Sequence, residues 1–210
     1  MGRLYYTYPM LARIFSCAVI GLDGVVVEVE VDTGQGLPGI DIVGLPDAAV
    51  VESRQRVQTA VRNAGLPFPR KRLVVNLAPA SVRKEGPAYD LPIALGVLVM
   101  QELLPPEAVA ATMVVGELSL DGSVRHARGV LSVAVAARTH GFKRLVVPRV
   151  DAPEASLVPD IEIIPVESLS ELVQYLSGAA RIPAPSVPEP GDDPAPVQTD
   201  FQEIKGQEHV

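Results

Sequence analysis

The segment from residue 73 to residue 103 constrains the fold more than any other part of the chain. It begins with a short apolar stretch, residues 73–77, which has the length and composition of a buried strand. A charged loop that contains Gly86 and Pro87 follows, and residues 91–103 are then almost wholly apolar. A helix that is apolar on every side is one that neighbouring elements cover all round. The segment therefore predicts a strand, a loop and a buried helix in succession.

The rest of the chain places strands before this segment and alternating strands and helices after it. Strands are predicted over residues 13–20, 25–31, 40–43, 72–77, 113–120, 144–147 and 162–166, and helices over 47–64, 91–103, 129–139 and 169–176. The pair Asp23-Gly24 predicts a hairpin between the first two strands. We expect Asp90 and Ser168 to cap the helices that follow them. This order of elements favours an α+β fold, an α/β sandwich.

Composition limits how the core can be built. Of the 210 residues, 48% are apolar but only 4% are aromatic, so Val, Leu, Ile and Ala must fill the interior. The single cysteine, Cys17, excludes an internal disulfide and lies in an apolar run, which predicts a buried thiol. No apolar run approaches the ~20 residues that span a bilayer. Residues 1–9 do not have the pattern of a signal peptide, so we expect a cytoplasmic protein without a membrane partner.

Composition also divides the chain into regions. Residues 10–180 carry the predicted elements, whereas residues 1–9 are expected to be a disordered N-terminal extension. From residue 181 to residue 199 the sequence is rich in proline and acidic side chains, which predicts an extended linker.

Four short motifs indicate a family. In order they are Gly44-Leu45-Pro46-Asp47, Asn76-Leu77-Ala78-Pro79-Ala80, the loop Arg83-Lys84-Glu85-Gly86-Pro87-Ala88-Tyr89-Asp90, and Gly116-Glu117-Leu118. With these motifs the chain resembles the N-terminal domain of the magnesium-chelatase-like AAA ATPases of bacteria, the YifB/ComM family, over residues 10–178. It also resembles the proteolytic domain of Lon-type proteases, which implies the fold of the second domain of ribosomal protein S5. Residues 200–210 are similar to the start of the family's ATPase module.

The Lon resemblance bears on catalysis. In those proteases the Gly-Pro loop carries a nucleophilic serine and a later helix carries a lysine that accepts the proton from the serine hydroxyl. This chain has Ala88 and Leu131 at the corresponding positions. A methyl group cannot attack a carbonyl and an isobutyl group cannot accept a proton. The resemblance therefore implies a segment without peptidase activity and without a cofactor of its own. ATP and Mg²⁺ are expected in the missing AAA module of a ring-shaped homo-oligomer, a hexamer by resemblance.

Basic residues are segregated although the net charge is −7. Residues 54–84 contain eight basic side chains and no acidic one, and residues 125–149 contain six and again no acidic one. The candidate polyanion contacts are Arg54, Arg56, Arg62, Arg70, Lys71, Arg72, Arg83, Lys84, Arg125 and Arg128. Such a surface would neutralise phosphates without reading bases. The alternative is an ordinary solvated surface.

Metal and nucleotide sites are not expected in this segment. His126, His140 and His209 lack the spacing of metal ligands, although His126 is a further candidate for a phosphate contact. No Gly-x-x-x-x-Gly-Lys-Ser/Thr string is present.

Three functions remain open from the sequence. The resemblance favours a DNA-facing or assembly-guiding collar of an AAA ATPase that acts in branch migration during natural transformation or recombination. A second hypothesis is a protein- or peptide-binding adaptor that retains a dead protease fold. A third is a chelatase motor subunit that inserts magnesium into a porphyrin. Retention of DNA by the isolated domain would separate the first hypothesis from the second.

Overall fold

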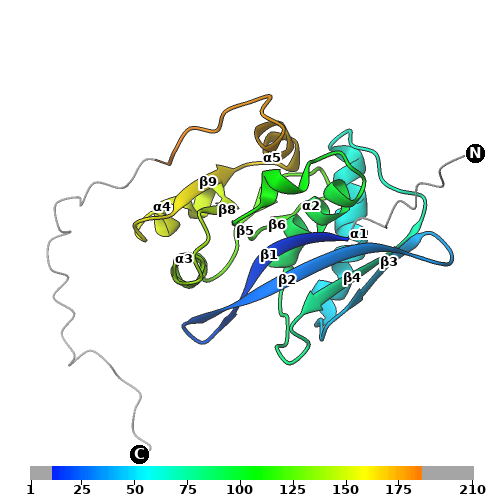
Figure 1. Ribbon diagram of the computed structural model, residues 1–210, viewed down its shortest axis with the longest axis horizontal. Coiled ribbons are helices and arrows are strands. Elements are labelled where there is room, and N and C mark those ends of the chain that lie inside the picture. The colour runs from blue at the N-terminus through cyan, green and yellow to red at the C-terminus, as the bar shows by residue number, and fades with distance from the viewer. Residues whose placement is uncertain (1–10, 186–210) are drawn as a thin grey trace, which may run out of the picture.

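A seven-stranded mixed sheet organises the chain, in the order β3-β4-β2-β1-β5-β8-β9 (Figure 1). The computed structural model describes residues 11–185. The strands are β1 (Ala12–Ile20), β2 (Asp23–Gly34), β3 (Gly39–Val43), β4 (Arg72–Ala78), β5 (Thr112–Val114), β8 (Arg144–Pro148) and β9 (Glu162–Val166). Antiparallel pairing joins β1 to β2 and β2 to β4, whereas the other neighbours pair in parallel. The predicted hairpin of the first two strands is confirmed, but its turn is Gly21-Leu22, and Asp23 and Gly24 pair within β2.

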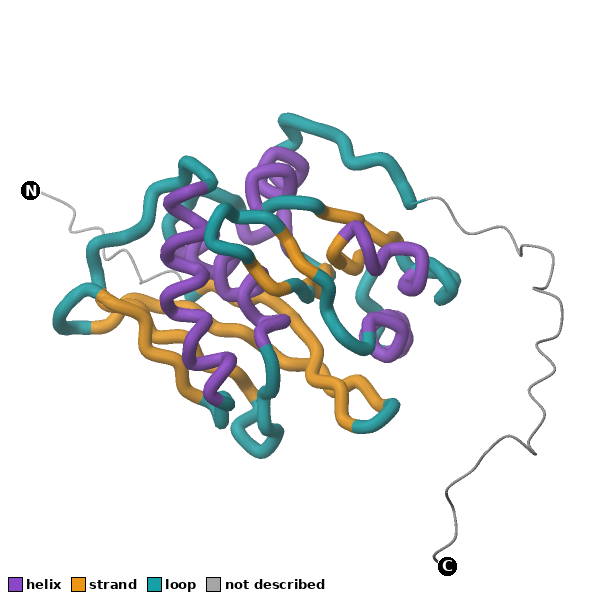
Figure 2. The backbone as a smooth tube through the Cα atoms, turned by 180° about the vertical axis from the view of Figure 1, so that it is seen from behind, coloured by secondary structure: helices purple, strands orange, loops and turns teal. Residues whose placement is uncertain are grey.

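Helices cover the sheet on both faces. They are α1 (Ala48–Asn63), α2 (Asp90–Met100), α3 (Val130–Thr139), α4 (Ala152–Ala155) and α5 (Leu169–Leu176). The apolar side chains of α1, α2 and α5 form one core with one face of the sheet. Those of α3 and α4 form a second core on the opposite face. Figure 2 shows α1 and α2 lying across the sheet from behind. The predicted α/β sandwich is confirmed.

Local sequence explains where α1 and α2 lie. The Asp47 carboxylate caps α1 by accepting the Val50 N–H at 2.8 Å. Nearly every residue of α2 is buried, as its apolar sequence predicts. Gly96 allows this helix to approach the sheet, because a β-carbon there would lie 2.5 Å from Cγ2 of Val31. The position therefore requires glycine for packing rather than for backbone conformation.

The second core covers only part of the sheet. Its strand residues come from β1, β5, β8 and β9, namely Cys17, Met113, Leu145, Val147 and Ile163. None of its members comes from β4 or β3. Within residues 11–185, the face of β4 and β3 that lies opposite α1 therefore carries no helix. The buried thiol predicted for Cys17 is confirmed, since the residue is 4% exposed.

Two predicted elements are wrong. The strand expected over residues 113–120 ends after Val114, and the chain continues into a separate two-stranded sheet of β6 (Glu117–Leu118) and β7 (Val124–Arg125). At this point the N–H of Gly116 donates to the carbonyl of Ala88 at 2.9 Å, which draws the chain away from the main sheet. Asp90 does not cap α2, because its carboxylate is turned into the interior. The cap predicted at Ser168 is confirmed, since its hydroxyl accepts the Glu171 N–H at 3.1 Å.

The first residues of the predicted linker contact the folded part of the chain. Ile182 packs against the first core, and residues 183–185 line a pocket with Arg149 and Ala152. The rest of the predicted linker, residues 186–199, lies outside the described residues. The predicted N-terminal extension and the predicted start of an ATPase module, residues 200–210, lie outside them as well.

Candidate functional site

The structure brings the two protease-like segments together. Ala88 lies in a single 3-10 turn, Pro87–Tyr89, and packs against the second core. That core also contains Val130, the neighbour of Leu131 at the start of α3. The Leu131 N–H donates to the Glu154 carboxylate at 3.0 Å, and its side chain is 40% exposed. Ala88 and Leu131 therefore both lie beside the second core, and both side chains are aliphatic.

Lys84 is not the surface cation that the sequence predicts. Its side chain is fully buried, and its ammonium donates to the carbonyl of Gly44 at 3.0 Å and to that of Pro79. Burial lowers the pKa of this ammonium because it removes water from around the charge. A group enclosed in this way cannot neutralise a phosphate, so we correct that prediction.

The same loop is tied to the start of α1. The N–H of Lys84 donates to the carbonyl of Leu45 at 3.1 Å, and the N–H of Asp47 donates to the carbonyl of Lys84 at 3.0 Å. The second oxygen of the Asp47 carboxylate accepts the N–H of Gly86 at 3.0 Å. The Gly-Pro loop and the loop after β3 therefore hold each other in place through backbone and side-chain bonds.

Arg56 is also engaged inside the molecule. Its Nε donates to Oδ2 of Asp90 at 2.7 Å and its Nη2 donates to Oδ1 at 3.1 Å, which is a two-pronged ion pair. Asp90 is fully buried and also accepts the N–H of Leu118 at 3.2 Å. The hydrogen bond to Asp90 raises the pKa of Arg56. This pair joins α1, α2 and β6, so Arg56 serves the fold and is not free to contact DNA.

Two further predicted contacts have acidic partners at the surface. Arg72 donates to Asp41 at 2.6 Å, and Arg83 lies 3.2 Å from a carboxylate oxygen of Glu85. The Arg83–Glu85 pair is largely open to solvent, and the Arg72–Asp41 pair is a little under half exposed. Each partner reduces the positive charge that these arginines offer to a polyanion.

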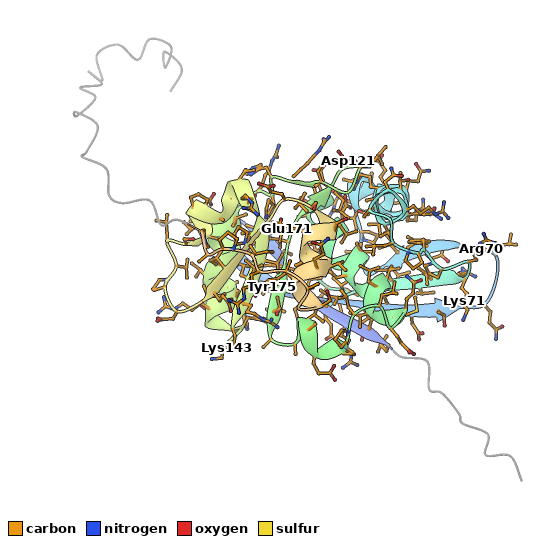
Figure 3. All side chains as sticks on the ribbon, turned by 90° about the horizontal axis from the view of Figure 1, so that it is seen from above. Arg70, Lys71, Asp121, Lys143, Glu171 and Tyr175 are labelled. Atoms are coloured by element: carbon orange, nitrogen blue, oxygen red, sulfur yellow. The ribbon has the colours of Figure 1, made fainter. Side chains whose placement is uncertain are left out.

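The remaining basic residues of the first cluster are exposed and unpaired. Arg54, Arg62, Arg70 and Lys71 form no ion pair with any residue between 11 and 185. The Arg62 guanidinium lies 5.7 Å from the centre of the Phe68 ring. Arg70 and Lys71 project together at one end of the molecule, and Lys143 lies toward the other end (Figure 3). We call Arg62, Arg70 and Lys71 the basic end.

The second predicted cluster lies around β7 and the start of α3. Arg125 donates to the hydroxyl of Ser119, and Arg128 is exposed. His126 bonds through Nδ1 to Asp151, whose other oxygen accepts the N–H of Ala127 at 2.8 Å. His126 is therefore already bonded to a carboxylate, which disfavours a phosphate contact at its imidazole.

The described residues contain neither a cluster of metal ligands nor a helix that could span a membrane. From residue 11 to residue 185, no group of three or more His, Cys, Asp or Glu side chains is arranged to hold a metal ion. None of the helices in that range has the length and apolar sequence needed to cross a membrane.

Sequence reasoning missed the buried bonds of Lys84 and the pair of Arg56 with Asp90. The members of the ion pair are 34 residues apart, and no periodicity in the sequence relates them. The one available signal was Asp90 itself, an acid next to a wholly apolar helix, since charged groups are rarely buried unless they are paired.

Comparison with known proteins places these features in a family. Residues 29–151 match the family described as subunit ChlI of Mg-chelatase. The chain is 48% identical over 172 residues to an uncharacterised protein of Mycobacterium tuberculosis and 38% identical over 173 residues to the competence protein ComM of Haemophilus influenzae. It is 34% identical over 199 residues to YifB of Escherichia coli.

These matches cover 82%, 82% and 94% of this chain, but 34%, 34% and 38% of the respective relatives, so the chain spans about a third of their length. A Lon protease of Rhizobium meliloti is 27% identical over 134 residues, covering 61% of this chain and 16% of that protein, which agrees with a Lon-like fold. The chain therefore belongs to the Mg-chelatase-like AAA family that includes ComM and YifB.

Proposed function

We propose that residues 11–185 are the non-catalytic N-terminal domain of an AAA ATPase that acts on DNA, and that the basic end contacts the phosphate backbone. The observation that carries this proposal is that some basic residues of the first cluster are engaged within the fold, whereas others are exposed. Arg56, Arg72 and Arg83 have acidic partners and Lys84 is buried, whereas Arg62, Arg70 and Lys71 are exposed and form no ion pair with any residue from 11 to 185. When exposed cations of this kind neutralise phosphates, counterions that were condensed on the DNA are released, which favours binding.

The loop geometry supports a display role for these side chains. Arg70 and Lys71 follow Pro67 and Pro69, and proline restricts the backbone of such a loop. Arg62 comes from the last turn of α1, and its guanidinium lies over the ring of Phe68, which belongs to this loop. We infer nonspecific binding to phosphates, because no further aromatic side chain accompanies Phe68 in this loop for stacking on bases.

We also propose that this domain has no peptidase activity. Ala88 and Leu131 offer neither a nucleophile nor a base, and the bonds of Lys84 and Asp47 hold the Gly-Pro loop in place. ATP and Mg²⁺ would be used by the part of the protein that follows this segment. The name of the relative ComM, a competence protein, supports a role in DNA uptake or recombination. In a ring, several basic ends would act as one collar of high avidity.

The test compares two variants of equal charge. In the 210-residue chain, R70E/K71E reverses two cations of the basic end, and R138E/K143E reverses two cations elsewhere. Binding of a labelled 30-base-pair duplex is measured by fluorescence anisotropy over a range of salt concentrations. R70E/K71E should weaken binding at least about tenfold and flatten the log–log salt slope by about 2, because each phosphate contact contributes about −0.9. Equal affinities for the two variants would show that the basic end is only a solvated surface.

A further inference from the structure

The two edges of the main sheet differ in how they are protected. At one edge, β9 contains Pro165, which has no N–H to offer, and residues 183–185 line a pocket together with it. At the other edge, β3 has the sequence Gly-Ile-Asp-Ile-Val and pairs on one side only, with β4. Among the described residues no element pairs with its outer side. Unprotected edges of this kind are templates for a further strand.

The peptide groups of β3 that face outward can be assigned. The N–H of Gly39 donates to the carbonyl of Lys71 at 3.4 Å, so the peptide groups of Gly39 are directed towards β4. Successive residues of a strand direct their peptide groups to opposite sides. The N–H and C=O groups of Ile40 and Ile42 therefore face away from the sheet. They offer two donors and two acceptors to an added chain.

An open pocket lies along this edge. It has a volume of about 400 Å³ and is lined by residues 37–41 together with Arg54 and Arg72. Arg54 belongs to α1, which covers one face of the sheet, whereas Arg72 pairs with Asp41 on the opposite face. A pocket that touches both side chains must therefore wrap around the edge of β3.

The pocket carries one uncompensated positive charge. The Nε of Arg54 donates to the carbonyl of Val51 in its own helix at 3.0 Å, and Arg54 has no acidic partner among residues 11–185. Arg72 is matched by Asp41, and its Nη1 donates to the carbonyl of Gln35 at 3.1 Å. Apolar side chains lie at both ends of the strand edge: Leu37, which lines the pocket, is 87% exposed, and Val43, the last residue of β3 and outside the pocket lining, is 47% exposed. The pocket thus combines a strand edge, an arginine and apolar side chains.

We propose that β3 binds an extended peptide segment as an added strand, with an Asp or Glu of that segment paired to Arg54. Strand addition takes its affinity from main-chain hydrogen bonds and its selectivity from contacts with alternate side chains. A nucleic-acid backbone offers no regular series of amide donors for the carbonyls of Ile40 and Ile42. A second copy of this chain paired edge to edge about a two-fold axis would bring Arg54 close to its own equivalent. An acidic peptide is the occupant that the charge favours.

Gly39 provides a variant that blocks the edge with little damage to the fold. A β-carbon at this position would meet no atom within 4 Å, and the residue lines the pocket. G39F should therefore fill the pocket while the domain stays folded. R54E removes the cation, and K143E is the control for a single charge reversal, because Lys143 is exposed and does not line the pocket.

The experiment selects ligands from a phage-displayed library of random nine-residue peptides on the 210-residue chain. Enriched peptides are then synthesised, and their affinities are measured by calorimetry. We expect alternating β-branched or aromatic residues with at least one Asp or Glu. R54E should bind these peptides about tenfold more weakly, since hydrogen bonds between charged groups are worth that factor or more. G39F should lose binding by at least that factor, and K143E should match the wild type.

Hydrogen exchange gives the second readout. Bound peptide should slow exchange of the Ile40 and Ile42 amides and leave those of β9 unchanged. The proposal is overturned if no peptide is enriched, if the enriched peptides are basic, or if they bind G39F as well as wild type. It is also overturned if duplex DNA displaces them from the R70E/K71E variant, or if G39F removes self-association of the chain in sedimentation instead of peptide binding.

Discussion

Arg56 and Asp90 allow a quantitative test of how the first core is held together. The change is R56M, which keeps the apolar stem of the arginine and removes its guanidinium. Asp90 accepts three hydrogen bonds, two from Arg56 and one from Leu118, and is fully buried. R56M removes the two charged bonds and leaves a carboxylate in the interior with a single donor.

The expected cost follows from that geometry. Removing one partner of a buried ion pair costs about 3–5 kcal/mol, because the charge that remains has neither water nor a counter-ion. For a domain of this size each kcal/mol shifts Tm by about 2–4 °C, so R56M should lower Tm by roughly 6–20 °C. D90L should cost less, because Arg56 is 20% exposed and keeps Glu52 at 3.6 Å.

The assay is thermal and urea unfolding followed by circular dichroism, on wild type, both single variants and the double variant R56M/D90L. The double variant should recover much of the loss, since a buried ion pair can be replaced by apolar groups at little net cost. R83M is the control, because the pair of Arg83 with Glu85 is 67% exposed on both sides and should contribute no more than about 1 kcal/mol. A loss for R56M no greater than that for R83M would refute the reasoning. Additive single and double changes would refute it as well.

Two further predictions concern buried ionisable groups. Burial lowers the pKa of Lys84 from its ordinary value near 10.5. At a pH between the lowered pKa and the ordinary one, the unfolded chain binds more protons than the folded chain. The free energy of unfolding therefore rises with pH in that window. As the pH is raised between two alkaline values, the urea midpoint of the wild type should therefore rise relative to that of K84M. The same pH dependence in both proteins would contradict this. Burial also raises the pKa of the Cys17 thiol to about 11, so at pH 8 the folded protein should not react with a disulfide reagent until urea unfolds it. Rapid labelling of Cys17 in the folded protein would show that the thiol is accessible.

The sequence by itself determined most of the local structure. The apolar runs, the hairpin of the first two strands and the cap at Ser168 are encoded by neighbouring residues, and these elements occur as predicted. The motifs also identified the family, because each stands in contiguous sequence. The positions of Ala88 and Leu131 could be read in the same way.

Tertiary structure alone decided which basic residues are free. In sequence, Lys84 and Arg83 are adjacent and equally charged, yet the loop after β3 encloses one of them and leaves the other exposed. Arg56 and Arg62 lie on the same helix, but only Arg56 faces Asp90 from α2. The edge pocket at β3 likewise depends on β3 being the last strand of the sheet and on α1 bringing Arg54 beside it. A side chain's exposure and its partners depend on segments that are distant in sequence, and local patterns carry no information about which segments meet.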